Sequence, residues 1–135
     1  WWRDLVEAHP EKMFPQILER VRGGATILAA DYVAAWIKLR EIRQIYAQAT
    51  SGFDAIITPT APIMPPNVAR LMTDDAYYKT ENLLALRNTR IENLMGGASL
   101  SLPTGVPSCG ILLSSGPMSE EKLLRLGAAA SKALS

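Results

Sequence analysis

The longest periodic pattern of apolar residues runs from about residue 26 to residue 49. Its apolar positions recur at intervals of three and four, which places them on one side of an α-helix. They are Leu28, Tyr32, Ala35, Leu39, Ile42, Ile45 and Ala49. Charged and amide side chains occupy the remaining positions. The pattern predicts a surface helix with a broad buried side.

Three further segments have helical patterns, at about 11–22, 80–95 and 119–134. Glycine pairs follow the first two segments, as expected where helices end. The third follows Ser119-Glu120-Glu121, which suits a helix start. Gly127 lies inside this last helix and should cost about 1 kcal/mol relative to alanine. Residues 67–76 are expected to form an irregular connection.

Short apolar runs at about 54–58, 98–102 and 109–113 predict strands. Gly52 and Pro59 bound the first run, which is too short for a helix. Prolines cannot donate ladder hydrogen bonds, so the chain from Pro59 to Pro66 should leave the sheet as an extended loop. Helices that alternate with short strands predict an α/β fold, here one of short strands packed by helices.

Composition narrows the classes of protein that fit. The 135 residues amount to one domain, and we expect 1–135 to be a single segment. The 14 basic residues nearly balance 13 acidic ones, which does not favour a nucleic-acid partner. No apolar run is long enough to span a membrane, and no secretory pattern opens the chain. One cysteine and one histidine cannot build a His/Cys metal cluster, so we expect a cytoplasmic protein without metal or cofactor.

The residues whose side chains could take part in catalysis are better explained by structural roles. His9 precedes a proline at a helix start and suits a solvated or capping role better than that of a base. Cys109 lies in an apolar strand and is expected to be a buried thiol. Asp74-Asp75 resembles a turn-forming pair. Glu92, with Arg87 and Arg90, is expected on the outer helix face. No nucleophile is accompanied by a base, so the sequence predicts no catalytic residue in this chain.

Two strand ends share small hydroxyl residues and prolines. Thr58-Pro59-Thr60 follows the first strand, and Ser101-Leu102-Pro103-Thr104-Gly105 ends the second. Open α/β sheets bind ligands beyond the carboxyl ends of their strands. These segments therefore predict the walls of a pocket whose reactive groups lie elsewhere.

Five segments occur in an order that resembles the C-terminal part of the amidase-signature family, to which the A subunit of glutamyl-tRNA amidotransferase is related. They are 53–62 (FDAIITPTAP), 88–96 (NTRIENLMG), 99–103 (SLSLP), 110–113 (GILL) and 120–124 (EEKLL). The resemblance extends from Arg20 to the end of the chain. It implies an α/β fold with a mixed sheet, a small-molecule amide substrate and no cofactor.

The resemblance also implies a mechanism. Family members hydrolyse or transfer amides with a serine nucleophile, a bridging serine in a cis peptide and a lysine base. The Gly/Ser-rich signature that carries these serines is not found in this sequence. Two departures matter: the turn 104–108 is compressed, and Leu86 stands where glutamine-dependent amidotransferases usually have an acidic residue. The second departure favours a general amidase.

Since the first residue is Trp1 rather than methionine, we expect this chain to be cut from a longer protein and to form the C-terminal segment of an amidase. It would be inactive alone, would pair with the missing N-terminal catalytic part and would self-associate in isolation. The alternative is a stand-alone, non-catalytic protein-interaction module.

Five residues are predicted to contact the substrate: Thr60, Pro62, Ile63, Asn93 and Arg20. For two of them a structural role is favoured. Asn93 is more readily explained as bonding the backbone near the Gly96 turn, and Arg20 as an exposed helix-end arginine.

Overall fold

A computed structural model describes residues 2–134. The chain folds as two compact units, one that ends at Trp36 and one that begins at Ile37. The expectation that the chain is a single segment of an amidase domain stays a prediction.

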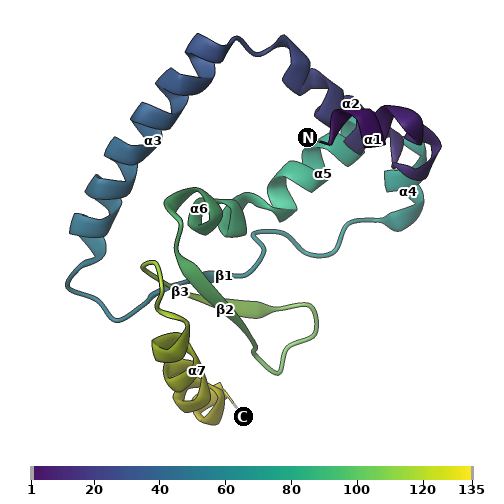
Figure 1. Cartoon of the computed structure of the whole chain (residues 1–135). Coiled ribbons are helices and arrows are strands. Elements are labelled where there is room, and N and C mark those ends of the chain that lie inside the picture. The colour runs from purple at the N-terminus through teal and green to yellow at the C-terminus, as the bar shows by residue number, and fades with distance from the viewer. Residues whose placement is uncertain (1, 135) are drawn as a thin grey trace. The chain divides into compact units, whose positions relative to one another are not determined.

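The unit that ends at Trp36 is helical (Figure 1). Its elements are α1 (Arg3–Ala8), the 3-10 turns η1 (Pro10–Lys12) and η2 (Gly24–Thr26), α2 (Pro15–Gly23) and the first part of α3 (Ala29–Thr50). The sequence pattern missed α1. It also placed the start of the second helix near residue 11, whereas α2 begins at Pro15 because Phe14 is extended and proline suits the first helical position.

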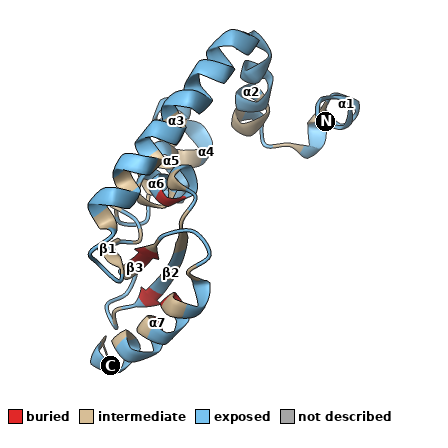
Figure 2. Cartoon of the chain, turned by 60° about the vertical axis from the view of Figure 1, so that its left-hand side comes forward, coloured by how far each residue is buried: buried red, intermediate tan, exposed pale blue. Residues whose placement is uncertain are grey.

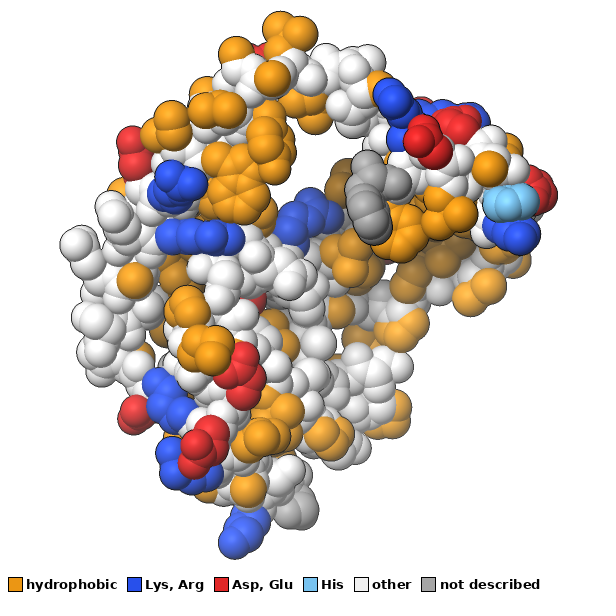
Figure 3. Space-filling model, in the orientation of Figure 1, with side chains coloured by type: hydrophobic (Ala, Val, Ile, Leu, Met, Phe, Trp, Pro, Cys, Tyr) orange, Lys and Arg blue, Asp and Glu red, His pale blue; other side chains and the backbone are white. Residues whose placement is uncertain are grey.

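Helix α3 has no buried residue, which contradicts the predicted broad buried side. Tyr32 and Ile45 are among its exposed apolar side chains, and Figure 3 shows apolar side chains along this helix at the surface. Its apolar positions still lie at helical spacing. Periodicity predicts a helix with an apolar face, but burial also needs a second surface, and the described residues supply one only in part, around half-buried Leu39 and Tyr46.

The unit that begins at Ile37 holds a three-stranded sheet in the order β1-β3-β2. Its elements after α3 are β1 (Ile56–Pro59), α4 (Val68–Thr73), α5 (Asp75–Ala85), α6 (Arg87–Met95), β2 (Ala98–Pro103), β3 (Gly110–Ser115) and α7 (Glu120–Leu134). Both outer strands run antiparallel to β3, with Leu113 opposite Ile57 and Leu100. The α/β class is therefore confirmed, with antiparallel pairing throughout the described strands.

The core lies where α7 packs against β2 and β3. Leu102, Leu113 and Leu123 form a buried cluster, and Leu100 and Ile111 pack against it. Figure 2 shows the buried positions concentrated in this region of the unit. Gly127 is buried in α7, where an added Cβ would collide with Leu100 Cδ2. This glycine lowers helix propensity, and it also allows the helix to approach the sheet closely.

The segment between β1 and β2 is more helical than predicted. Residues 67–76 contain α4, whose N-cap Asn67 accepts a hydrogen bond from the Arg70 amide at 3.0 Å. Asp74 caps α5 in the same way, accepting from the Tyr77 amide at 2.9 Å. The single helix predicted over 80–95 is two helices, since α5 ends at Ala85 and α6 begins at Arg87, with Leu86 as the cap residue between them.

Glu92 is the one buried residue of α6, with 7% of its surface exposed, which contradicts its predicted place on the outer face. Its Oε1 accepts a hydrogen bond from the Tyr46 hydroxyl of α3 at 2.7 Å. The prediction failed because carboxylates are ordinarily solvated and the sequence pattern does not reveal the distant tyrosine that pairs with this one.

Candidate functional site

The carboxyl ends of β1 and β2 lie at the same end of the sheet, on either side of β3. Both strands run antiparallel to β3, so their last residues face the same side of the unit. Thr60, just after β1, bonds through its amide to the Gly110 carbonyl at 2.9 Å. The hydroxyls of Thr60 and Ser101 lie 2.7 Å apart. The two strand ends singled out in the sequence are thus joined by a direct hydrogen bond.

An open groove of about 510 Å³ lies beside this hydroxyl pair. We call it the strand-end groove. The described residues that line it are uncharged: Thr60, Ala61, Ser101, Pro103, Gly105, Val106, Pro107, Ser108, Cys109 and Gly110. Hydroxyl groups can donate and accept hydrogen bonds, while the prolines and Val106 supply apolar walls.

Helix α6 fixes the end of β1 next to the groove. The Asn88 side-chain amide donates to the Pro59 carbonyl at 2.7 Å. Because Thr60 follows Pro59 directly, this bond restrains the backbone from which the Thr60 hydroxyl projects. On the other wall, Thr104 Oγ1 donates to the Cys109 carbonyl at 3.1 Å, which closes the turn between β2 and β3.

Cys109 is exposed, which contradicts its prediction as a buried thiol. Strand β3 begins at Gly110, so Cys109 lies in the turn that precedes the strand. Its amide bonds to the Val106 carbonyl at 3.1 Å within that turn. The apolar run 109–113 overlaps strand β3 from Gly110 onward, and the buried positions of the strand begin only at Leu112.

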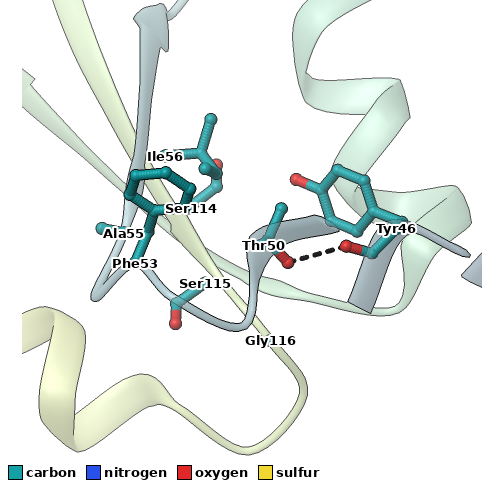
Figure 4. A pocket seen from close by; sticks show the side chains of 8 residues that line it. All are labelled: Tyr46, Thr50, Phe53, Ala55, Ile56, Ser114, Ser115 and Gly116. Carbon is teal, nitrogen blue, oxygen red and sulfur yellow. Dashed lines mark hydrogen bonds between the residues drawn. The ribbon is translucent and has the colours of Figure 1, made fainter. Parts of the chain in front are cut away.

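A second hydroxyl pair lies further along the sheet, where Ser99 and Ser114 are 3.0 Å apart. Ser114 also lines a small cavity of about 20 Å³, which is enough for one water molecule (Figure 4). Tyr46 and Thr50 lie on the α3 side of this cavity, and the Thr50 hydroxyl donates to the Tyr46 carbonyl at 2.8 Å.

Tyr46, which lines this cavity, also pairs with Glu92. Burial and the hydrogen bond to the Glu92 carboxylate raise the pKa of Tyr46 from 10.0 to about 12. Glu92 Oε2 is buried without a hydrogen-bond partner among the described residues. A Cβ on Gly97 would lie 2.7 Å from that oxygen and 2.6 Å from the Ser115 carbonyl, so only glycine fits there without displacing its neighbours.

The predicted substrate-contact residues do not all lie together. Thr60 lines the strand-end groove, whereas Pro62 and Ile63 are half-buried in the loop that follows it. Asn93 is exposed on α6. The backbone near the Gly96 turn is bonded by Arg43, whose Nε donates to the Leu94 carbonyl at 2.7 Å. Arg20 is exposed on α2, in the other unit. Substrate contact by these five residues stays a prediction.

Sequence reasoning named Ser101 only as part of a wall and did not single out its hydroxyl. The alternation of Ser99 and Ser101 with leucines in β2 placed both serines on one face of the strand. That alternation was the available signal. The sequence does not reveal the register of the strands. That register pairs Ser99 with Ser114 and brings Ser101 close to Thr60, which follows β1.

Residues 2–134 contain neither a metal centre nor a membrane-spanning helix. No group of three or more His, Cys, Asp or Glu side chains among them is arranged to hold a metal ion. In the same range, no helix combines the length and the apolar character that a membrane crossing requires.

Comparison with solved structures shows the kind of fold. The chain matches a crystal structure described as an amidase with a TM-score of 0.72, over 99% of this chain and 32% of the other, at 22% sequence identity. This likeness shows an amidase fold. No protein-family model matches the sequence.

Comparison of sequences finds relatives with more specific names. The chain is 30% identical over 118 residues to 2-amino-5-chloromuconic acid deaminase of Comamonas testosteroni, which covers 84% of this chain and 25% of the relative. The A subunit of glutamyl-tRNA(Gln) amidotransferase of Sulfurisphaera tokodaii is 31% identical over 77% of this chain and 22% of its own length. Its counterpart in Dehalococcoides mccartyi is 24% identical over 93% of this chain and 26% of its own length.

The homologues of this chain are therefore amidase-signature proteins, and the resemblance seen in the sequence is confirmed. The chain spans about a quarter of the length of the curated relatives it matches.

Proposed function

We propose that this chain is the C-terminal segment of an enzyme that hydrolyses carbon–nitrogen amide bonds. In this proposal it supplies part of the sheet scaffold and one wall of the substrate pocket, and its partner is the catalytic part of the same enzyme. The observation that carries the proposal is the hydrogen bond between the Thr60 and Ser101 hydroxyls, at the end of the sheet where β1 and β2 finish. Homology to amidase-signature proteins supports the choice of reaction.

The attacking group is proposed to come from outside this chain. A serine becomes an effective nucleophile when a base accepts its proton. Ser101 is paired with a threonine hydroxyl, and Ser99 with a serine hydroxyl. A neighbouring hydroxyl is far too weak a base for that role. In the parent enzyme we assign attack on the carbonyl to a Ser-Ser-Lys set, as the family resemblance implies.

A serine-directed fluorophosphonate tests this assignment. The 135-residue chain should form no covalent adduct by intact mass, whereas a serine amidase of the same family, used as the positive control, should be labelled stoichiometrically. Stoichiometric labelling of this chain would overturn the proposal, because it would place an activated serine among the chain's own residues.

The exposed apolar side chains favour a partner surface. Ile37, Ile45, Phe53 and Ile57 are each more than half exposed in the unit that begins at Ile37. Exposed apolar surface and unpaired strand edges promote association. We therefore expect the isolated chain to self-associate at micromolar concentration. A clean monomer in sedimentation velocity would count heavily against a missing partner surface and would favour the stand-alone module.

A further inference from the structure

We propose that the outer edge of β2 pairs with an extended segment of the catalytic part of the same enzyme, which adds a strand to the sheet beside α7. The segment carries apolar side chains at alternate positions, on the face that α7 covers. This inference rests on the proposed function, because it names the contact through which the chain joins its partner.

The register of the sheet shows which backbone groups point outward. In an antiparallel pair, every second residue bonds to the neighbouring strand through its own N–H and C=O, and the residues between them direct those groups the other way. The Thr60 amide donates to the Gly110 carbonyl at 2.9 Å. Gly110, Leu112 and Ser114 of β3 therefore direct their backbone groups toward β1, and the residues that alternate with them direct theirs toward β2.

The outer edge of β2 is open. Leu100 and Leu102 are paired with the residues of β3 that face β2, so they bond to that strand. Ser99 and Ser101 alternate with them and direct both backbone groups away from β3, and Pro103 directs its carbonyl the same way. All three are exposed, and no described residue bonds these backbone groups on the outer side. This edge therefore offers a partner strand both donors and acceptors at regular spacing.

The outer edge of β1 offers much less. Pro59 has no N–H, and its carbonyl already accepts a hydrogen bond from the Asn88 side chain at 2.7 Å. Prolines and covering groups are features that close a sheet edge to other strands. Within β1, only Ile57 directs an N–H outward. The edge suited to strand addition is therefore that of β2.

A groove beside β2 accommodates side chains of the added strand. It has a volume of about 370 Å³ and is lined by Ala98, Ser99 and Leu100 of β2 and by Glu120, Leu123 and Leu124 of α7. No residue of β3 lines it, which places it on the outer side of β2. Side chains alternate along a strand, so an added strand directs every second one into this groove. The alanine and leucines favour apolar side chains at those positions.

A second copy of this chain does not fit at the same edge. Helix α7 packs mainly on β2, the outer strand. Neighbouring strands lie about 4.8 Å apart, whereas packed helices need about 8–10 Å between their axes. Antiparallel pairing of two β2 edges keeps both α7 helices on one face, so the helices would collide. An extended segment fits, and the catalytic part can supply it, since this chain spans about a quarter of the length of its curated relatives.

Amide hydrogen exchange tests the proposal at single residues. We would compare the protein encoded by the complete gene with the 135-residue chain, the latter at a concentration where sedimentation shows a monomer. Mass spectrometry with electron-transfer fragmentation resolves the individual amides. Those of Ser99 and Ser101 should exchange about a hundredfold or more slowly in the complete protein, because they gain carbonyl partners. The Ile57 amide, on the other edge, should exchange equally in both, and the Leu100 amide should be protected in both.

Two proline variants give an independent readout. Ser99→Pro removes an outward N–H of β2, and Ile57→Pro removes an outward N–H of β1, so neither removes a bond to β3. In the complete protein, Ser99→Pro should accelerate exchange of the Ser101 amide by about tenfold or more, and Ile57→Pro should leave it unchanged. Ser99→Ala removes the hydroxyl but keeps the N–H, and should behave as wild type.

Equal exchange of the Ser99 and Ser101 amides in the two proteins would overturn the proposal. So would protection that the two proline variants reduce alike, or slowing that grows with the concentration of the 135-residue chain, which would make a second copy the occupant. None of these outcomes bears on fluorophosphonate labelling, so they leave the proposed function standing. Labelling of this chain would overturn the proposed function without altering the exchange result, and a gene that encodes nothing beyond this chain would overturn both.

Discussion

The unit that begins at Ile37 buries leucines between α7 and its sheet, whereas the unit that ends at Trp36 leaves its apolar side chains accessible. The described helical elements of the first unit contain no buried residue. Both units have helices at the positions where apolar residues recur with helical spacing. The comparison shows that periodicity determines where helices form, while a core forms only where a second apolar surface meets the first.

Removing a core leucine should have the largest effect on the second unit. Leu123 is 2% exposed and belongs to the buried cluster, so Leu123→Ala should lower the free energy of unfolding by about 2–5 kcal/mol. Leu124, its neighbour on α7, is 62% exposed, and Leu124→Ala should change the free energy of unfolding by less than about 0.5 kcal/mol. Urea unfolding followed by circular dichroism measures both. Equal effects would mean that α7 does not pack on the sheet as described.

Replacing one glycine by alanine in each unit tests how closely each unit is packed. Gly97→Ala places its Cβ against the Ser115 carbonyl, a backbone atom at the end of β3, and should lower the free energy of unfolding by about 1–3 kcal/mol. Gly24 in the first unit has no described atom within 4 Å of the same position, so Gly24→Ala should not destabilise. The same urea titration applies, and a tolerated Gly97→Ala would contradict the close approach.

The Tyr46–Glu92 pair should contribute less than the core leucines. Tyr46→Phe leaves the buried Glu92 carboxylate without its hydroxyl donor and should cost about 1–3 kcal/mol. Tyr32 lies on the same helix but is exposed, so Tyr32→Phe serves as the matched control and should be neutral. A neutral Tyr46→Phe would show that Glu92 is solvated.

The same pair predicts a pH dependence. The pKa of Tyr46 is raised to about 12 in the folded chain, so folded Tyr46 keeps its proton after the unfolded tyrosine has begun to lose it near pH 10. Its contribution to stability is therefore complete below about pH 10 and is lost as the pH rises toward about 12. Wild type should lose more stability over this window than Tyr46→Phe, and parallel curves would contradict the raised pKa.

The smallest effect is expected in the first unit. Arg22 donates from Nε and Nη2 to the Glu7 carboxylate at 2.9 and 2.6 Å, and this pair lowers the pKa of Glu7. Both side chains are well exposed, and exposed ion pairs contribute little. Arg22→Ala should leave the thermal unfolding midpoint nearly unchanged, and any change should vanish at high salt. A large, salt-independent loss would show that this unit has a core.

Much of the second unit was predictable from local chemistry. Gly52 and Pro59 bounded β1, Gly96 ended α6 in a left-handed conformation, and alternating leucines marked β2. These features depend on residues close together in the sequence. The α/β class and the convergence of the two strand ends followed from them.

What sequence reasoning missed depends on distant partners. Glu92 is buried because Tyr46, on α3, donates a hydrogen bond to it, and Cys109 is exposed because β3 begins one residue later. The caps Asn67 and Asp74 depend on nearby residues alone, but they lie in a segment without hydrophobic periodicity. For that reason α4 and the start of α5 were not predicted. In the site, the Thr60–Ser101 bond required the register of the sheet, which composition does not provide.

The proposed function makes this chain one part of an amide-hydrolysing enzyme whose nucleophile and base are encoded elsewhere. Sequencing the genomic region upstream of the codon for Trp1 gives the decisive observation. We predict a continuous open reading frame that contains a lysine followed by a Gly/Ser-rich segment with two serines. A start codon immediately upstream, preceded by an in-frame stop, would contradict the proposed function and favour the stand-alone module.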